Sequence, residues 1–128
     1  MRSRSLAFRV ASIWLVLAGL TLLFPGVGNV VFDLHLRNWG LASEYGGALV
    51  AFGVMYWVFA GDAERYAPIM PIIAAGGLLN VLINAYWWAV GEYTMQSAIF
   101  NVVLNSALAV WFWTLRPRGA GSARTSSV

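Results

Sequence analysis

The chain contains no cysteine, only one histidine and only 10% charged residues. Without cysteine it can form no disulfide, thiolate metal site, iron–sulfur cluster or cysteine nucleophile. A single histidine excludes a bis-histidine haem, and the further ligands that zinc requires are missing. We therefore expect no metal and no cofactor, and we interpret His35 as a solvated loop residue.

The shortage of charge also separates this chain from soluble proteins, in which about 25% of residues are charged. Of its 128 residues, 60% are hydrophobic. All eight basic residues are arginines at the ends of apolar runs, so the net charge of +3 indicates membrane flanks and argues against nucleic-acid binding. The composition predicts one integral membrane domain, with the lipid bilayer as its surroundings.

Four apolar runs are long enough to cross a bilayer as helices of roughly 20 residues. They cover residues 7–24, 43–60, 68–90 and 95–115, and residues 116–128 form a basic tail that we expect to be flexible. Short connections between them predict an all-α, antiparallel four-helix bundle. All but one of the eight arginines then lie on the side of the two termini, the exception being Arg37. Because arginines concentrate on the inner side, both termini are predicted to be cytoplasmic.

The stretch from residue 28 to residue 42 is too polar to span a membrane. Between Phe32 and Arg37 its apolar and polar residues alternate. One interpretation is an interfacial loop or helix that dips into the headgroups. The other is a cap over the bundle that supplies polar groups to a site. The sequence leaves both open.

Two pairs of asparagines mark the last two runs. Asn80 and Asn84 lie one helical turn apart in the third run, and Asn101 and Asn105 do so in the fourth. Counted from the shared turn at residues 91–94, the pairs lie at matching depths. Because an unpartnered amide in hydrocarbon is costly, we predict a ladder in which Asn84 meets Asn101 and Asn80 meets Asn105.

This ladder allows two roles. Amides between membrane helices most often serve packing. The alternative is a polar ligand pocket that opens outward, with Gln96, Ser97 and Tyr45 nearby.

The second run is rich in small residues, which allow helices in lipid to approach closely. Gly46, Gly47 and Gly53 are therefore predicted to pack against another helix or subunit. Glu44 is the one carboxylate near the interior of a run. We expect it at the positive end of the helix, hydrogen-bonded to Arg37, Tyr45 or the loop backbone, with a proton or cation site as the alternative.

No nucleophile–base pair, phosphate loop or paired carboxylate occurs, so no catalytic residue is assigned and enzyme activity is not expected from this chain alone. The first run contains no acidic residue. This excludes the class of small four-span drug exporters, which carry an essential glutamate in their first helix.

Several short motifs occur in order: Arg9, Gly19, Pro25-Gly26 and then Ser43-Glu44-Tyr45-Gly46-Gly47-Ala48, which opens the glycine-rich run. This pattern resembles the DoxX-like superfamily of small bacterial four-helix membrane proteins. It is most similar to an uncharacterised branch with an acidic residue and Gly-Gly at the start of the second helix. The resemblance implies a four-helix fold in the bacterial inner membrane, and one branch of the superfamily is associated with membrane oxidoreductases as a subunit.

Three hypotheses for function follow. The first is a non-catalytic accessory or scaffold subunit, which binds another membrane protein or a second copy of itself. The second is a binder or carrier of a lipophilic molecule such as a quinone or lipid, which uses the asparagine cluster. The third is a membrane enzyme that uses Glu44.

Overall fold

The computed structural model describes residues 2–32 and 37–118. All regular secondary structure in these ranges is helical, which confirms the predicted all-α class. The elements are α1 (Arg2–Leu23), α2 (Pro25–Phe32), α3 (Trp39–Ala60), α4 (Ala63–Tyr66), the 3-10 turn η1 (Ala67–Ile69), α5 (Met70–Ala89) and α6 (Met95–Thr114). His35 and the last residues of the predicted tail lie outside the described ranges.

Three segments are long and apolar enough to cross a membrane: Ser3–Leu23, Ala63–Ala89 and Met95–Thr114. Helix α3 has 22 residues, the same length as α1. It is not among these three segments, and it carries Glu44 and several glycines. The protein is thus helical, with three segments suited to a bilayer.

A proline and a helix cap set the limits of the connection between α1 and α3. Helix α1 ends before Pro25 as predicted, and Pro25 then opens α2, because proline is tolerated at the first helical position. The backbone N–H of Leu41 donates to Oδ1 of Asn38 at 2.9 Å, so α3 begins at Trp39. The predicted start at residue 43 is therefore late. The stretch 28–42 is largely helical where it is described.

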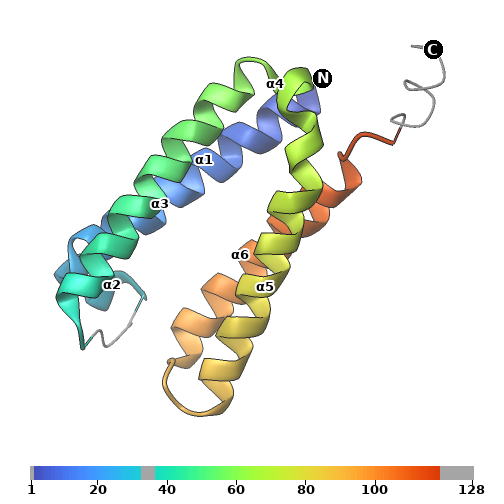
Figure 1. Ribbon diagram of the computed structural model, residues 1–128. Helices are drawn as coiled ribbons and strands as arrows, with labels where there is room; N and C mark the ends of the chain where they lie inside the picture. The colour runs from blue at the N-terminus through green and yellow to red at the C-terminus, as the bar shows by residue number, and fades with distance from the viewer. Residues whose placement is uncertain (1, 33–36, 119–128) are drawn as a thin grey trace, which may run out of the picture.

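Helices α1 and α3 run antiparallel and lie side by side over most of their length (Figure 1). Two of the predicted packing glycines make this possible. A Cβ atom on Gly53 would lie 2.6 Å from Cγ2 of Val16 and 2.9 Å from the carbonyl oxygen of Ser12. A Cβ on Gly46 would overlap the backbone of Gly19 and Leu23. Both glycines therefore face α1, as predicted.

Side-chain hydroxyls reinforce this pair at three levels. Each donates to a backbone carbonyl of the partner helix: Ser5 to Ala60 at 2.8 Å, Ser12 to Gly53 at 2.6 Å and Ser43 to Leu23 at 3.1 Å. Hydroxyl–carbonyl bonds of this kind join helices in lipid, where water cannot compete for the carbonyl. The α1/α3 pair is thus fixed along its length.

Helices α5 and α6 form the second antiparallel pair. Gly91, in the turn that connects them, has a φ of 85°, a conformation that favours glycine. Within the pair, a Cβ on Gly77 would lie 3.2 Å from Cβ of Ala109, so the helices approach closely there as well. Pro71 lies in the first turn of α5, directly after η1, where proline is tolerated.

The two pairs are packed together at one end, and α2 also contacts α6 at the other. Phe8 and Phe112 are fully buried at the packed end, with ring centroids 5.5 Å apart, and Met70 is fully buried beside them. Arg4 adds polar contacts at the same end: Nε donates to the carbonyl oxygen of Leu115 at 2.8 Å, and Nη1 lies 2.6 Å from Oε2 of Glu64. We call this region the joint.

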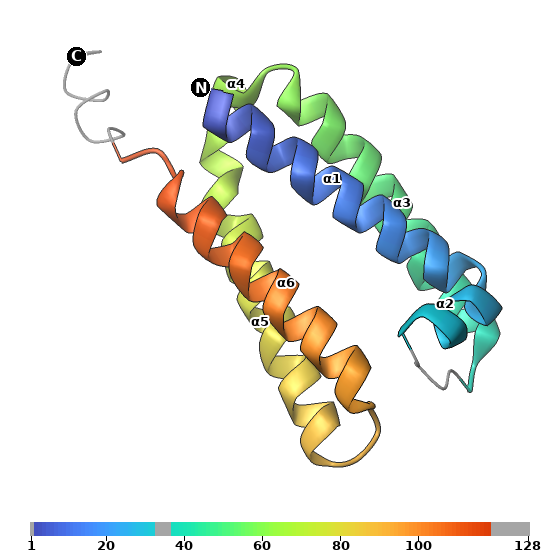
Figure 2. The same cartoon turned by 180° about the vertical axis from the view of Figure 1, so that it is seen from behind.

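Away from the joint the two pairs diverge, so that the molecule has the shape of a V (Figures 1 and 2). Helix α1 begins and α6 ends at the joint, and α2 lies at the open end (Figure 2). The buried apolar cluster lies at the joint. An evenly packed bundle would have buried side chains between the pairs throughout.

Candidate functional site: a cleft between the helix pairs

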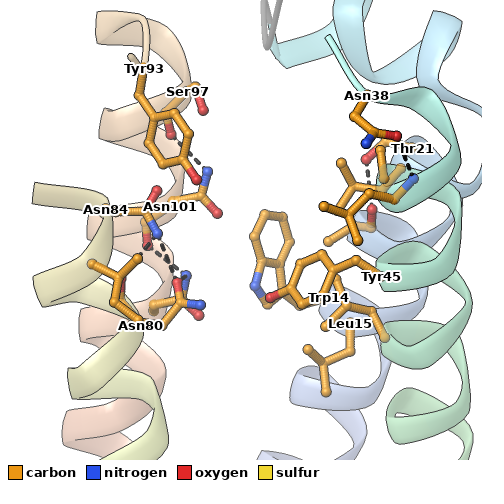
Figure 3. Close-up of a pocket in the computed structure, with 17 residues that line it drawn as sticks. Trp14, Leu15, Thr21, Asn38, Tyr45, Asn80, Asn84, Tyr93, Ser97 and Asn101 are labelled. Atoms are coloured by element: carbon orange, nitrogen blue, oxygen red, sulfur yellow. Dashed lines mark hydrogen bonds between the residues drawn. The ribbon is translucent and has the colours of Figure 1, made fainter. Parts of the chain in front are cut away.

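A cleft of about 650 Å³ lies between the two arms of the V. Its volume is within the range of pockets that bind small molecules, about 300–1,000 Å³. Side chains from both pairs line it, and the close-up in Figure 3 shows them facing each other across an open space.

The wall formed by α5, α6 and their connecting turn is polar. It presents the four predicted asparagines together with Ser97 and Tyr93: Asn80, Asn84, Asn101 and Asn105 all line the cleft. The asparagines therefore gather at one surface, as the sequence predicted. Ile83 is the apolar member of this wall.

The opposite wall, formed by α1 and α3, is mostly apolar and aromatic. Its members are Trp14, Leu15, Ala18, Leu22, Leu41, Ala42, Tyr45 and Leu49, with Thr21 and Asn38 adding polar groups. In Figure 3 the rings of Trp14 and Tyr45 point from this wall toward the asparagines. The cleft thus has one hydrogen-bonding side and one hydrophobic side.

Three of the asparagine amides are oriented by the same contact with their own helix. Each donates from Nδ2 to the backbone carbonyl one turn earlier: Asn84 to Asn80 at 3.0 Å, Asn101 to Ser97 at 2.9 Å and Asn105 to Asn101 at 2.8 Å. Asn80 differs, because its Oδ1 accepts from Nδ2 of Asn84 at 2.9 Å and from Nδ2 of Asn105 at 3.3 Å. Asn80 is the centre of the cluster.

One of the two predicted ladder contacts is present. Asn105 donates to Asn80 across the pair, as predicted. In the described chain no hydrogen bond joins Asn84 to Asn101, so that contact was predicted wrongly. The reason is local: a helical asparagine can bond the preceding turn of its own helix, and the depth argument ignored this competitor.

None of the described residues that line the cleft is charged. Tyr93, in the turn between α5 and α6, has its pKa raised by burial and further by the neighbouring Tyr45. Its phenol therefore stays protonated at neutral pH and can donate a hydrogen bond. The site is polar and neutral.

Two residues singled out in the sequence lie elsewhere. Glu44 is exposed, does not line the cleft and makes no hydrogen bond or ion pair within the described ranges, so neither Arg37 nor Tyr45 is its partner. Because α3 begins at Trp39, Glu44 is also no longer at the helix start. A Cβ on Gly47 would meet nothing within 4 Å, so Gly47 does not pack against α1.

The expected neighbours of the asparagines are partly correct. Ser97 and Tyr45 line the cleft, whereas Gln96 does not. The sequence reasoning missed Trp14 and Asn38. Trp14 carried a usable signal: it lies in the middle of the first apolar run, whereas membrane tryptophans concentrate at run ends. Asn38 was hidden because the start of α3 was placed too late.

No cluster of three or more potential metal ligands occurs in the described residues. A scan against known protein families, a search of the curated proteins and a search of the solved structures each found no match to this chain. The resemblance to the DoxX-like superfamily therefore stays a prediction from sequence motifs.

Proposed function

We propose that this protein is a small four-span membrane protein that binds a lipophilic molecule in the cleft between its helix pairs. The observation that carries the proposal is the contrast between the two walls, with amides on one side and Trp14, Tyr45 and leucines on the other. An amphipathic molecule has the same division. Its polar head would contact the asparagines, while its apolar body would lie on the aromatic wall.

The four-span arrangement follows from pairing. Helix α3 has the same length as α1 and lies against it through Gly46 and Gly53 and the serine contacts. If α1 crosses the bilayer, α3 crosses with it, because their hydrogen bonds extend from one end of the pair to the other. The arginine distribution supports a cytoplasmic position of the joint and both termini. The cleft then lies toward the outer face of a bacterial inner membrane.

Photolabelling tests the ligand proposal directly. The protein would be placed in lipid nanodiscs with hexadecanol carrying a diazirine, and the labelled peptides would be mapped by mass spectrometry. We expect label at cleft residues such as Trp14, Tyr45 and Asn101, and competition by unlabelled lipophile. Uniform, non-competable label over the lipid-facing surface would contradict a binding cleft.

A matched pair of variants sharpens this test. Ile83 lines the cleft, whereas its neighbour Leu82 is 60% exposed and lies outside the lining. Ile83→Trp should fill the space and remove competable labelling. Leu82→Trp adds the same bulk on another face and should leave labelling unchanged.

A second candidate function is the accessory subunit. It is favoured by the outward-facing glycines Gly47 and Gly76, neither of which has a neighbour within 4 Å of an added Cβ. A helix of another membrane protein could approach these positions closely. Gly47→Leu should then remove a co-purifying polypeptide or dissociate a homo-oligomer. Unchanged co-purification would count against this surface.

The enzyme hypothesis gains nothing from the position of Glu44, which is exposed and outside the cleft.

A further inference from the structure

The orientation of the asparagine amides points to one chemical class of ligand. In Asn84, Asn101 and Asn105 the Nδ2 group is engaged by the helix's own backbone. None of their Oδ1 atoms receives a hydrogen bond from the described residues. The polar wall therefore presents three acceptors whose direction is set by the helices.

These oxygens are accessible. Asn84 is only 6% exposed as a residue, yet no buried side-chain oxygen or nitrogen in the described chain lacks a hydrogen-bond partner. An Oδ1 atom without an internal partner must therefore reach the cleft surface. An amide oxygen bordering a largely apolar space is poorly solvated, so a matching donor gains more there than in water.

Donors are also present. Asn80 uses its Oδ1 for Asn84 and Asn105, which leaves its Nδ2 as a donor, and the phenol of Tyr93 is another. A group that both donates and accepts satisfies this surface best: it donates to an Oδ1 and accepts from Nδ2 of Asn80. A hydroxyl is the smallest group that does so.

The residues described as lining the cleft include no charged side chain, which disfavours the other common lipid heads. A phosphate or carboxylate would lose its hydration, would face amide oxygens and would find no arginine among these residues. A cationic amine would likewise find no carboxylate among them. This lining favours a neutral head.

We infer that the ligand of this cleft is a neutral, hydroxyl-bearing lipophile, a long-chain or polycyclic alcohol or phenol, whose O–H donates to one of the amide oxygens of Asn84, Asn101 and Asn105. This inference rests on the proposed function and specifies its substrate class. An acceptor-only head such as an ether, ester or oxidised quinone could use only the donors of this wall, such as Nδ2 of Asn80 and the phenol of Tyr93. It would leave the three asparagine oxygens without a donor and would bind more weakly.

The test uses a matched series of competitors against the diazirine-bearing hexadecanol in nanodiscs at neutral pH. The competitors are hexadecanol, its methyl ether and palmitate. We expect hexadecanol to compete about tenfold better than the ether, the ratio for one hydrogen bond of about 1.4 kcal/mol. Palmitate should be weaker than hexadecanol. Equal competition by the alcohol and the ether, or stronger competition by palmitate, would overturn the inference and leave the proposed cleft intact.

A variant assigns the effect to the asparagines. The Nδ2 of Asn101 bonds only within its own helix, so Asn101→Leu breaks no contact between helices. This variant should lower the ratio of competition by hexadecanol to competition by its methyl ether toward one, while the ether still competes. The control is Val103→Leu. Val103 lies on α6 and is 57% exposed, so this change should leave the alcohol-to-ether ratio unchanged. If Asn101→Leu does not fold, Asn101→Val replaces it.

The outcomes separate the two claims. Absence of competable label in the cleft would remove the proposed function, and the inference would fall with it. Competable label that is indifferent to the hydroxyl, or a ratio unchanged in Asn101→Leu, would remove the inference alone.

Discussion

Nδ2 of Asn105 donates to Oδ1 of Asn80 at 3.3 Å and thereby joins α6 to α5 at the polar wall of the cleft. The same Oδ1 accepts from Asn84, so a contact between helices and a contact within a helix meet at one atom. This arrangement makes the two predicted asparagine contacts energetically distinguishable.

A double-mutant cycle on the hairpin should show this difference. With alanine substitutions, the coupling energy between Asn80 and Asn105 should be about 0.6 kcal/mol and at most about 1.7 kcal/mol, the range for such bonds in membranes. The coupling between Asn84 and Asn101 should be close to zero, because each amide bonds its own helix. Reversible unfolding in mixed detergent micelles measures both. Equal coupling in the two pairs would contradict the observed bonding.

Adjacent glycines in α3 provide a second test. Gly46→Ala places a methyl group against the backbone of Gly19 and Leu23, which cannot move aside easily. We expect a loss of roughly 1–3 kcal/mol in unfolding free energy, the cost of overpacking. Gly47→Ala, with open space around it, should change stability by less than about 0.5 kcal/mol. The reverse order would mean that the other glycine face packs against α1.

The polar contacts at the joint predict unequal effects of two substitutions. Glu64→Gln removes an ion pair whose side chains are 21% and 48% exposed, so it should cost less than about 1 kcal/mol and lose its effect at high salt. Arg4→Gln also removes the bond to the carbonyl of Leu115 and should cost more. Thermal unfolding at low and high ionic strength measures both effects. A larger loss from Glu64→Gln would show that the ion pair dominates.

The orientation in the membrane is testable because the chain has no cysteine. A single cysteine replacing Glu92, in the turn between α5 and α6, should react with an impermeant maleimide in intact cells. Asp62→Cys, between α3 and α4, should react only after permeabilisation, and Asn38→Cys should behave like Glu92→Cys. Labelling of Asp62→Cys and Asn38→Cys from the same side would show that α3 does not cross the bilayer.

The sequence predicted the helical class, the glycines at the α1/α3 contact and the gathering of the asparagines, because each follows from spacing along one helix or its neighbour. The sequence could not show which of Gly46 and Gly47 packs against α1. Adjacent residues point about 100° apart around the helix axis, and the sequence alone does not give the rotation of the helix about that axis.

The apolar wall was less predictable. Trp14 and Asn38 line the cleft where α1 and α3 diverge from α5 and α6, and the two pairs are packed together at the joint by contacts such as that between Phe8 and Phe112. No local pattern encodes the angle between two helix pairs. The predicted contact between Asn84 and Asn101 is absent for a different reason. Each amide could bond either the other asparagine or the preceding turn of its own helix, and only the side-chain rotamers decide between these partners.

The joint has a mechanical consequence. Because the pairs are packed together around Phe8 and Phe112 and by Arg4, a rotation of one pair against the other would pivot there and would shift α2 against α6 at the opposite end. Such a rotation would change the distance between the walls more at Asn38, far from the joint, than at Leu49, closer to it. A few degrees of rotation would therefore change the width available to an occupant while leaving the contacts within each pair in place.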